Sequence, residues 1–264
     1  MALKFSANLN FLFTETAATI SERIRLASQN GFRAVEIPYP EGELKEAAQA
    51  VNDTGIVVSL INIAFDKTKE ELKFGSTSVP GAENLFSQQL DDTIAFAKIV
   101  KCKKVHLMAG TRNNKSEGDH LATYISNLKI ASKKLQSNNM TGVIEPINGY
   151  VIPTYFMNSY IKASQVLNEI NSDNIKLMVD LYHLQHISGN FTKTLEQHKD
   201  IIGHFQIAQV PFRNEPDTPG ELNYEYIFKT LEAVGHQDWI GCEYKPLTTT
   251  VEGLNWFSKF NLKL

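Results

Sequence analysis

Short runs of β-forming apolar residues recur eight times along the chain, and segments with helical spacing separate them. Most of the runs are continuous and do not alternate apolar with polar residues, which is typical of parallel strands covered on both faces. The sequence therefore predicts an α/β protein with a largely parallel sheet. The eight runs are KFSANL from Lys4, AVEIPY from Ala34, IVVSLINI from Ile56, KVHLMA from Lys104, GVIEPI from Gly142, IKLMVDLYH from Ile175, GHFQIAQV from Gly203 and WIGCEYKP from Trp239.

Between these runs, apolar residues fall on one helical face, which predicts helices within residues 20–27, 44–51, 121–135 and 254–260. Eight strand–helix units in 264 residues match the size of a (β/α)8 barrel. A doubly wound sheet is the alternative, but no strand is followed by a Gly-rich phosphate-binding turn. No linker interrupts the alternation, so we predict a single (β/α)8 TIM-barrel domain over residues 1–264.

The connections are of unequal length. Those from helix to strand are short, whereas those from strand to helix, within residues 65–83, 111–119 and 211–223, are long. In barrel enzymes the active site lies at the carboxyl ends of the strands, where the strand-to-helix loops are. The long loops therefore predict the end of the barrel that carries the chemistry.

Composition excludes several classes of protein. The chain has 26 Lys and Arg against 29 Asp and Glu, so its net charge of −3 argues against general nucleic-acid binding. Two cysteines, Cys102 and Cys242, are too few for a disulfide scaffold. We find no secretion signal and no apolar run of the roughly 20 residues that a membrane span needs. These features predict a cytoplasmic protein with no membrane and no nucleic-acid partner, and leave open whether it forms a homo-oligomer.

Polar side chains end, or lie within, the last four apolar runs. The runs contain Glu145; Asp180 followed by His183; His204 and Gln206; and Glu243 and Lys245. Carboxylates that enter an apolar interior must be paired, protonated or bound to a metal. A divalent cation would remove the repulsion among three converging carboxylates, and oxygen ligands favour Mg²⁺ or Mn²⁺.

Each of these residues also has a simpler interpretation. An acidic residue at a strand end is commonly a helix cap or a surface group, and Gln206 alone is typical of a hydrogen-bonded core amide. His106 and His204 are equally well explained as buried histidines with satisfied hydrogen bonds. Four polar residues at the ends of four consecutive strands are harder to attribute to coincidence.

At these residues the chain resembles a known family. EPIN at Glu145, DLYH at Asp180, GHFQIAQVPFRNEPDTPGELNY from Gly203 and GCEYKP from Gly241 are similar to hydroxypyruvate isomerases. FSANLNFLF near the start, HLMAG at His106 and TVEGLNW near the end also fit. The wider group is the xylose isomerase-like TIM-barrel superfamily, which includes ketose epimerases, inosose dehydratases and metal-dependent DNA-repair endonucleases.

The resemblance implies an isomerase that interconverts hydroxypyruvate and 2-hydroxy-3-oxopropanoate (tartronate semialdehyde) through an enediolate. It implies that Glu145 and Glu243 transfer the proton and that His183 and Arg213 contact substrate. The implied ligands of a divalent metal, Mg²⁺ or Mn²⁺, are Glu145, Asp180, Gln206 and Glu243. A carboxylate bound to a metal is a weaker base, so either one oxygen stays free or the metal is not essential for turnover.

The substrate carboxylate needs a cationic partner, and the sequence offers two candidate side chains. Arg213 offers a bidentate fork and Lys245 a point charge, and we favour Arg213 over Lys245. A surface ion pair between Arg213 and Glu215 is the alternative interpretation of that arginine.

Other reactions of the superfamily remain as alternatives. They are an isomerase or epimerase of a larger sugar acid such as 2-oxo-tetronate or its phosphate, a metal-dependent dehydratase, and a barrel retained as a binding protein. Val151 stands where ketose epimerases tend to carry a second Glu, and Gln206 stands where the endonucleases usually carry His. Both departures favour the isomerase.

Overall fold

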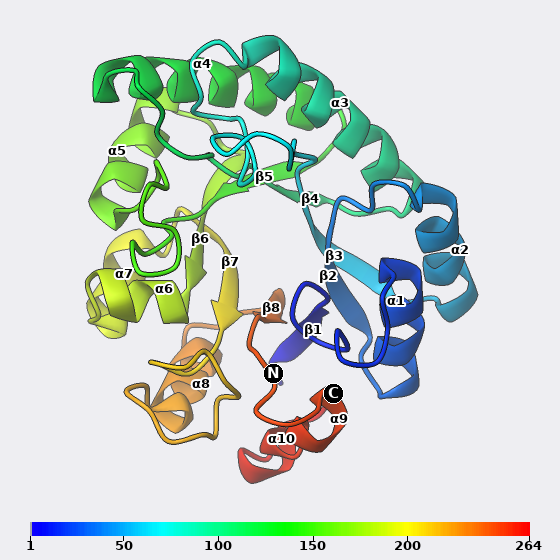
Figure 1. The fold of residues 1–264 in the computed structure, drawn as a ribbon. Helices are drawn as coiled ribbons and strands as arrows, with labels where there is room; N and C mark the ends of the chain where they lie inside the picture. The colour runs from blue at the N-terminus through cyan, green and yellow to red at the C-terminus, as the bar shows by residue number, and fades with distance from the viewer. Residues whose placement is uncertain (1) are drawn as a thin grey trace. The chain divides into compact units, whose positions relative to one another are not determined.

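The computed structural model describes residues 2–264. Its eight strands form a closed barrel in chain order, so the prediction of a (β/α)8 barrel is confirmed (Figure 1). The strands are β1 (Lys4–Asn8), β2 (Ala34–Pro38), β3 (Val57–Asn62), β4 (Lys104–His106), β5 (Thr141–Ile144), β6 (Ile175–Asp180), β7 (Ile202–Ile207) and β8 (Trp239–Cys242). All eight coincide with the apolar runs of the sequence.

Helices follow the strands. They are α1 (Ile20–Gln29), α2 (Leu44–Thr54), α3 (Glu83–Ile99), α4 (Glu117–Gln136), α5 (Tyr160–Ile170), α6 (Leu181–Ile187), α7 (Phe191–His198), α8 (Tyr224–Ala233), α9 (Thr250–Gly253) and α10 (Trp256–Lys259). The helix predicted within residues 254–260 is α10, and the short helix α9 precedes it. Strand β6 ends at Asp180, so the prediction that the strand continues to His183 was wrong: the Asp180 side chain caps α6 and starts a helix there.

Local sequence signals explain where several helices begin and end. Thr19 with Glu22, and Ser116 with Asp119, form capping boxes at the starts of α1 and α4. Gly55 has a φ of 66° and ends α2 in the left-handed conformation that glycine adopts without a steric penalty. These local signals fix where α1 and α4 begin and where α2 ends.

The chain divides into two compact units. Unit 1 runs to Ser59 and continues over Val179–Asp200 and His204–Leu264; unit 2 comprises Leu60–Met178 and Ile201–Gly203. In unit 1, β1 pairs in parallel with β2 and with β8, and α1 packs against α2 (Figure 1). An aromatic cluster of Phe5, Phe228 and Trp256 lies beside β1, with ring centroids 5.4–5.9 Å apart.

In unit 2, β4 pairs in parallel with β3 and β5, and β5 pairs with β6. Leu60, Val143 and Met178 form a buried cluster between these strands. Helix α4 packs against α3 and α5 (Figure 1). Within residues 2–264, none of the helices is long and apolar enough to cross a membrane.

Candidate active site

Arg213 is the centre of a buried charge cluster in unit 1. Its Nη2 donates to Asp180 Oδ2 at 3.0 Å and to Glu243 Oε2 at 2.5 Å, and its Nε donates to the Glu243 carbonyl oxygen at 3.2 Å. The guanidinium lies over the rings of Phe11 and Tyr182, at 4.7 and 4.8 Å from their centroids. Two carboxylates from separate strand ends therefore share one guanidinium that two aromatic rings hold in place.

Asp180 acts in two ways. Its Oδ1 accepts the backbone N–H of Tyr182 at 2.9 Å and so caps α6, while Oδ2 accepts from Arg213. His183 is buried on α6, with Nε2 at 3.6 Å from Asp180 Oδ2. The helix-cap interpretation of Asp180 is thus correct for one oxygen, and the second oxygen belongs to the charge cluster.

Glu36, on β2, is a buried carboxylate that sequence reasoning missed. Each of its oxygens accepts two hydrogen bonds: Oε1 from Ser6 Oγ at 3.1 Å and His204 Nε2 at 2.6 Å, and Oε2 from Asn8 Nδ2 at 3.0 Å and Gln206 Nε2 at 2.8 Å. It lies inside AVEIPY, so the argument applied to the later strands would also have found it. Unlike β7, β2 has no second polar residue on the same face to strengthen the signal.

Asn8 connects Glu36 to Glu243. Its Nδ2 donates both to Glu36 Oε2 and to Glu243 Oε1, the latter at 3.1 Å, and its Oδ1 accepts the backbone N–H of Asn10 at 3.0 Å. Because the oxygen has its own donor, the orientation of the Asn8 amide is fixed. Both carboxylate oxygens of Glu243 are therefore held, one by Asn8 and one by Arg213.

The pKa values of these buried carboxyl groups are shifted in different directions. For Glu243, burial raises the pKa to about 8, because the opposing charge of Arg213 does not compensate for the loss of water and for the negative charges of Asp180 and Glu36. Burial also raises the pKa of Asp180. For Glu36, burial acts in the same direction, but His204 and the hydrogen bonds from Gln206 and Asn8 outweigh it and leave the pKa below its usual range.

Glu145 and His106 lie together in unit 2. Both are buried; Glu145 directly follows β5, His106 is the last residue of β4, and His106 Nε2 is 3.6 Å from Glu145 Oε2. That separation is longer than a hydrogen bond. The burial of Glu145 agrees with the prediction that a carboxylate follows the fifth strand into the interior.

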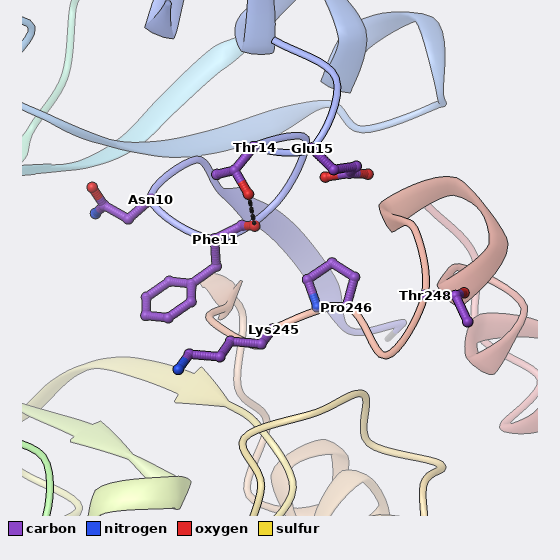
Figure 2. A pocket seen from close by; sticks show the side chains of 7 residues that line it. All are labelled: Asn10, Phe11, Thr14, Glu15, Lys245, Pro246 and Thr248. Carbon is purple, nitrogen blue, oxygen red and sulfur yellow. Dashed lines mark hydrogen bonds between the residues drawn. The ribbon is translucent and has the colours of Figure 1, made fainter. Parts of the chain in front are cut away.

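Lys245 lines a pocket of about 370 Å³ in unit 1 (Figure 2). The loop after β1 provides one side of the pocket and the loop after β8 the other, and the Lys245 side chain extends past the ring of Phe11 (Figure 2). In the described part of the chain, Lys245 makes no ion pair. The lining residues are Asn10, Phe11, Thr14, Glu15, Lys245, Pro246 and Thr248.

The structure thus brings most of the predicted residues of unit 1 together. Asp180 and Glu243 share Arg213, and Gln206 joins them through Glu36 and Asn8. The alternative that Arg213 is a surface residue paired with Glu215 is wrong. Arg213 is buried, and Glu215 accepts the backbone N–H of Leu247 at 3.1 Å.

The donor set fits a hard divalent cation. Gln206 gives its N–H to Glu36, and its buried Oε1 has no hydrogen-bond partner among residues 2–264, so a carbonyl oxygen is left for a ligand. Asp180 and Glu243 add two carboxylates, whereas the guanidinium of Arg213 is the one cationic group paired with both. Amide and carboxylate oxygens are the ligands that Mg²⁺ and Mn²⁺ prefer.

The chain is similar to known proteins over nearly its whole length. The family model of the xylose isomerase-like TIM barrel matches residues 24–260. The chain is 62% identical to a Drosophila melanogaster protein provisionally named hydroxypyruvate isomerase, over 100% of both chains. It is 36% identical to the hydroxypyruvate isomerase of Escherichia coli, over 98% of this chain and 99% of the relative.

Two further similar proteins carry names of other activities. The 2-oxo-tetronate isomerase of Cupriavidus necator is 34% identical over 97% of this chain and 98% of the relative. A crystal structure from Brucella melitensis, described as an AP endonuclease of family 2, superimposes with a TM-score of 0.91 at 34% identity and covers 97% of this chain and 98% of that chain. The same fold therefore carries names from more than one reaction class.

Proposed function

The chain belongs to the xylose isomerase-like TIM-barrel family and is an isomerase, and from that premise we propose that it interconverts hydroxypyruvate and 2-hydroxy-3-oxopropanoate. The observation that carries the proposal is Glu243, a buried carboxylate whose two oxygens are held by Asn8 and Arg213 and whose pKa of about 8 in the metal-free protein lies near neutrality. A general acid or base works best when its pKa is near the working pH.

The reaction needs a proton to leave one carbon and another to arrive at the next. Loss of a C3 proton from hydroxypyruvate gives an enediolate with a hydroxyl group on C3 and an oxyanion on C2. Protonation at C2, with transfer of the C3 hydroxyl proton to the C2 oxygen, forms the C3 carbonyl and gives 2-hydroxy-3-oxopropanoate. We assign the two proton transfers to Glu145 and Glu243. Asn8 and Arg213 would keep the Glu243 carboxyl group in one orientation throughout.

We assign a divalent metal, Mg²⁺ or Mn²⁺, to Glu145, Asp180, Gln206 and Glu243. The assignment is supported by the carbonyl oxygen of Gln206 and by the burial of Glu145, Asp180 and His183, three residues of types that ligate metals. Such an ion, when bound, polarises the substrate oxygens and stabilises the negative charge of the enediolate.

The substrate carboxylate is assigned to Lys245, with Arg213 and His183 as further substrate contacts. The guanidinium of Arg213 is already shared by Asp180 and Glu243, whereas the Lys245 ammonium lines an open pocket. This reverses the preference for Arg213 that the sequence suggested, because the sequence could not reveal the partners of the arginine.

A larger sugar acid is the second candidate. The pocket beside Phe11 has room for more than a three-carbon acid, and one relative is named for 2-oxo-tetronate. A DNA endonuclease is less consistent with this chain, because its net charge is −3 and the β7 side chain that we assign to the metal is the amide Gln206.

The test is substrate consumption followed by proton NMR with hydroxypyruvate, 2-oxo-tetronate and fructose, with added Mg²⁺ or Mn²⁺. We expect turnover of the acids and no comparable turnover of fructose. Lys245→Met should raise KM for the acid on the order of tenfold, since a charge-assisted contact is lost, whereas Lys98→Met on α3 should not. Equal catalytic efficiency toward fructose and hydroxypyruvate would contradict the proposal.

A further inference from the structure

We propose that Glu36 is a positioning residue that sets the orientation of two active-site side chains, the amide of Gln206 and the carboxylate of Glu243. The inference rests on the proposed function, because it assigns a role toward the same site. Glu36 itself would touch neither substrate nor metal and would act only through its neighbours.

The first step of the argument is the hydrogen-bond balance of Glu36. It is 1% exposed, and its two oxygens accept four hydrogen bonds from four side chains. A buried carboxylate that is satisfied in this way favours one arrangement, since rotating any donor away removes a hydrogen bond that no water replaces in a dry environment. The network therefore fixes its donors as much as they fix Glu36.

The second step is the orientation of Gln206. Glu36 is an acceptor only, so the Gln206 side chain must present its Nε2 to Glu36 and keep its Oε1 on the other side. That oxygen is the one without a hydrogen-bond partner in residues 2–264. If the amide were reversed, an N–H group would replace the carbonyl oxygen, and an amide N–H cannot ligate a cation.

The third step is the connection to Glu243. The two hydrogens of Asn8 Nδ2 are divided between Glu36 Oε2 and Glu243 Oε1. Glu36 and the backbone N–H of Asn10 together hold Asn8 in the orientation in which it donates to Glu243.

The backbone of β8 also makes room for the network. A Cβ at Gly241 would lie 2.2 Å from Glu36 Oε1, so any larger residue at this position would displace the carboxylate. Glycine at this point of β8 is thus a requirement of the buried Glu36.

The test begins with Glu36→Gln, which keeps the shape but replaces one acceptor oxygen by an NH₂ group. Two of the four donors then face a donor, and the Gln206 amide is expected to turn its oxygen toward residue 36. Changes behind a metal site typically cost 10–100-fold in affinity or activity. We expect Mn²⁺ affinity, measured by calorimetry, to fall at least about tenfold, and kcat to fall similarly with little change in KM.

Ser6→Ala is the matched control. It removes one hydrogen bond from Glu36, and among the described residues the Ser6 hydroxyl donates to Glu36 and to the Ile240 carbonyl oxygen, not to Gln206 or Glu243. We expect Mn²⁺ affinity and kcat within about threefold of wild type. A Glu36→Gln protein that folds and keeps wild-type Mn²⁺ affinity and kcat would overturn the inference, as would a Ser6→Ala protein that loses as much as Glu36→Gln.

If Glu36→Gln does not fold, Asn8→Ala tests the part of the inference that concerns Glu243. It breaks the link to Glu243 while three donors still satisfy Glu36, so kcat should fall on the order of tenfold, and an unchanged kcat would overturn the inference. If the wild-type protein bound no Mn²⁺, the metal assignment would fail, and kcat of these variants would still test the positioning role. If the wild-type protein isomerised neither acid, the proposed reaction would fail, and the Mn²⁺ titration of the variants would still test the positioning role.

Discussion

Two arginines that follow strands, Arg213 in unit 1 and Arg112 in unit 2, make the same kinds of contact in different surroundings. Arg112 donates to Glu117 Oε2 at 2.9 Å and to the carbonyl oxygen of Tyr155 at 2.7 Å, and lies over the ring of Phe156. Arg213 likewise contacts a glutamate, a carbonyl oxygen and aromatic rings. The Arg112 side chain is 29% exposed and that of Arg213 is 8% exposed.

The glutamates paired with these arginines have pKa values shifted in opposite directions. Hydrogen bonds from Arg112 and Lys162 lower the pKa of Glu117, which is 53% exposed, to about 2. Burial raises the pKa of Glu243, which is 12% exposed, to about 8, although its arginine is closer. An arginine contact alone therefore does not decide the pKa of a carboxyl group. Desolvation and neighbouring carboxylates also contribute to the pKa. They explain why the carboxyl group of one ion pair stays ionised near neutral pH while the other has a pKa suited to proton transfer.

The largest expected difference between the two regions is catalytic. Glu243→Gln removes the group to which we assign a proton transfer, so kcat for hydroxypyruvate should fall about 10²–10⁴-fold. Glu117→Gln removes a glutamate from an ion pair of the same kind, and we expect nearly unchanged kcat. Steady-state kinetics with both variants checks this, and more than about a tenth of wild-type kcat in Glu243→Gln would rule out Glu243 as the base.

The second difference concerns stability. Arg213→Met leaves Asp180 and Glu243 buried without their cation, and breaking a buried pair in this way costs about 3–5 kcal/mol. Arg112→Met breaks a partly exposed pair and should cost about 0–1 kcal/mol. Urea unfolding monitored by circular dichroism measures both values. Similar losses in the two variants would show that burial does not distinguish the two arginines.

The third difference is in the pH dependence of stability of the metal-free protein. The pKa of Glu243 is about 8 in the folded protein against 4.5 in the unfolded chain, so as pH rises the unfolded state loses its proton first. The free energy of unfolding should therefore fall between about pH 4.5 and pH 8 and be insensitive to Glu243 outside that window. Asp180, whose pKa is also raised, acts in the same direction.

Glu243→Gln should remove the Glu243 contribution, on the order of 3–4 kcal/mol between pH 5 and pH 8, and Glu117→Gln should not. Chemical unfolding in EDTA at several pH values checks the difference between wild type and variant. A pH dependence that is the same in wild type and Glu243→Gln would contradict a raised pKa.

The sequence was sufficient to predict the fold because each apolar run is continuous and local. All eight predicted strands are present, and capping residues such as Thr19 and Gly55 mark helix ends that are set within one turn. The last helix is shorter than the apolar spacing over 254–260 suggested: α10 comprises only Trp256–Lys259, because Leu254 and Asn255 separate it from α9. That the chain is a single domain stays a prediction.

The site was only partly predictable, for a physical reason. Asp180, Gln206 and Glu243 stood out because each is polar in an apolar run, but the partners of Arg213 come from strands that lie far apart in sequence. Glu36 and Asn8 lie on the first two strands, and only the closure of β8 onto β1 brings them to Glu243. Contacts of this kind depend on tertiary structure and leave no periodic signal in the sequence.

The most direct measurement is proton NMR of hydroxypyruvate in D₂O with the wild-type protein and Mg²⁺ or Mn²⁺. If Glu243 belongs to an isomerase of small 2-oxo acids, the C3 hydrogens of hydroxypyruvate should disappear, and signals of 2-hydroxy-3-oxopropanoate should appear, at a rate proportional to protein concentration. Glu243→Gln should slow both changes at least a hundredfold. Hydroxypyruvate that keeps its C3 hydrogens and forms no product with either metal, at a rate no faster than in a protein-free control, would contradict the assignment.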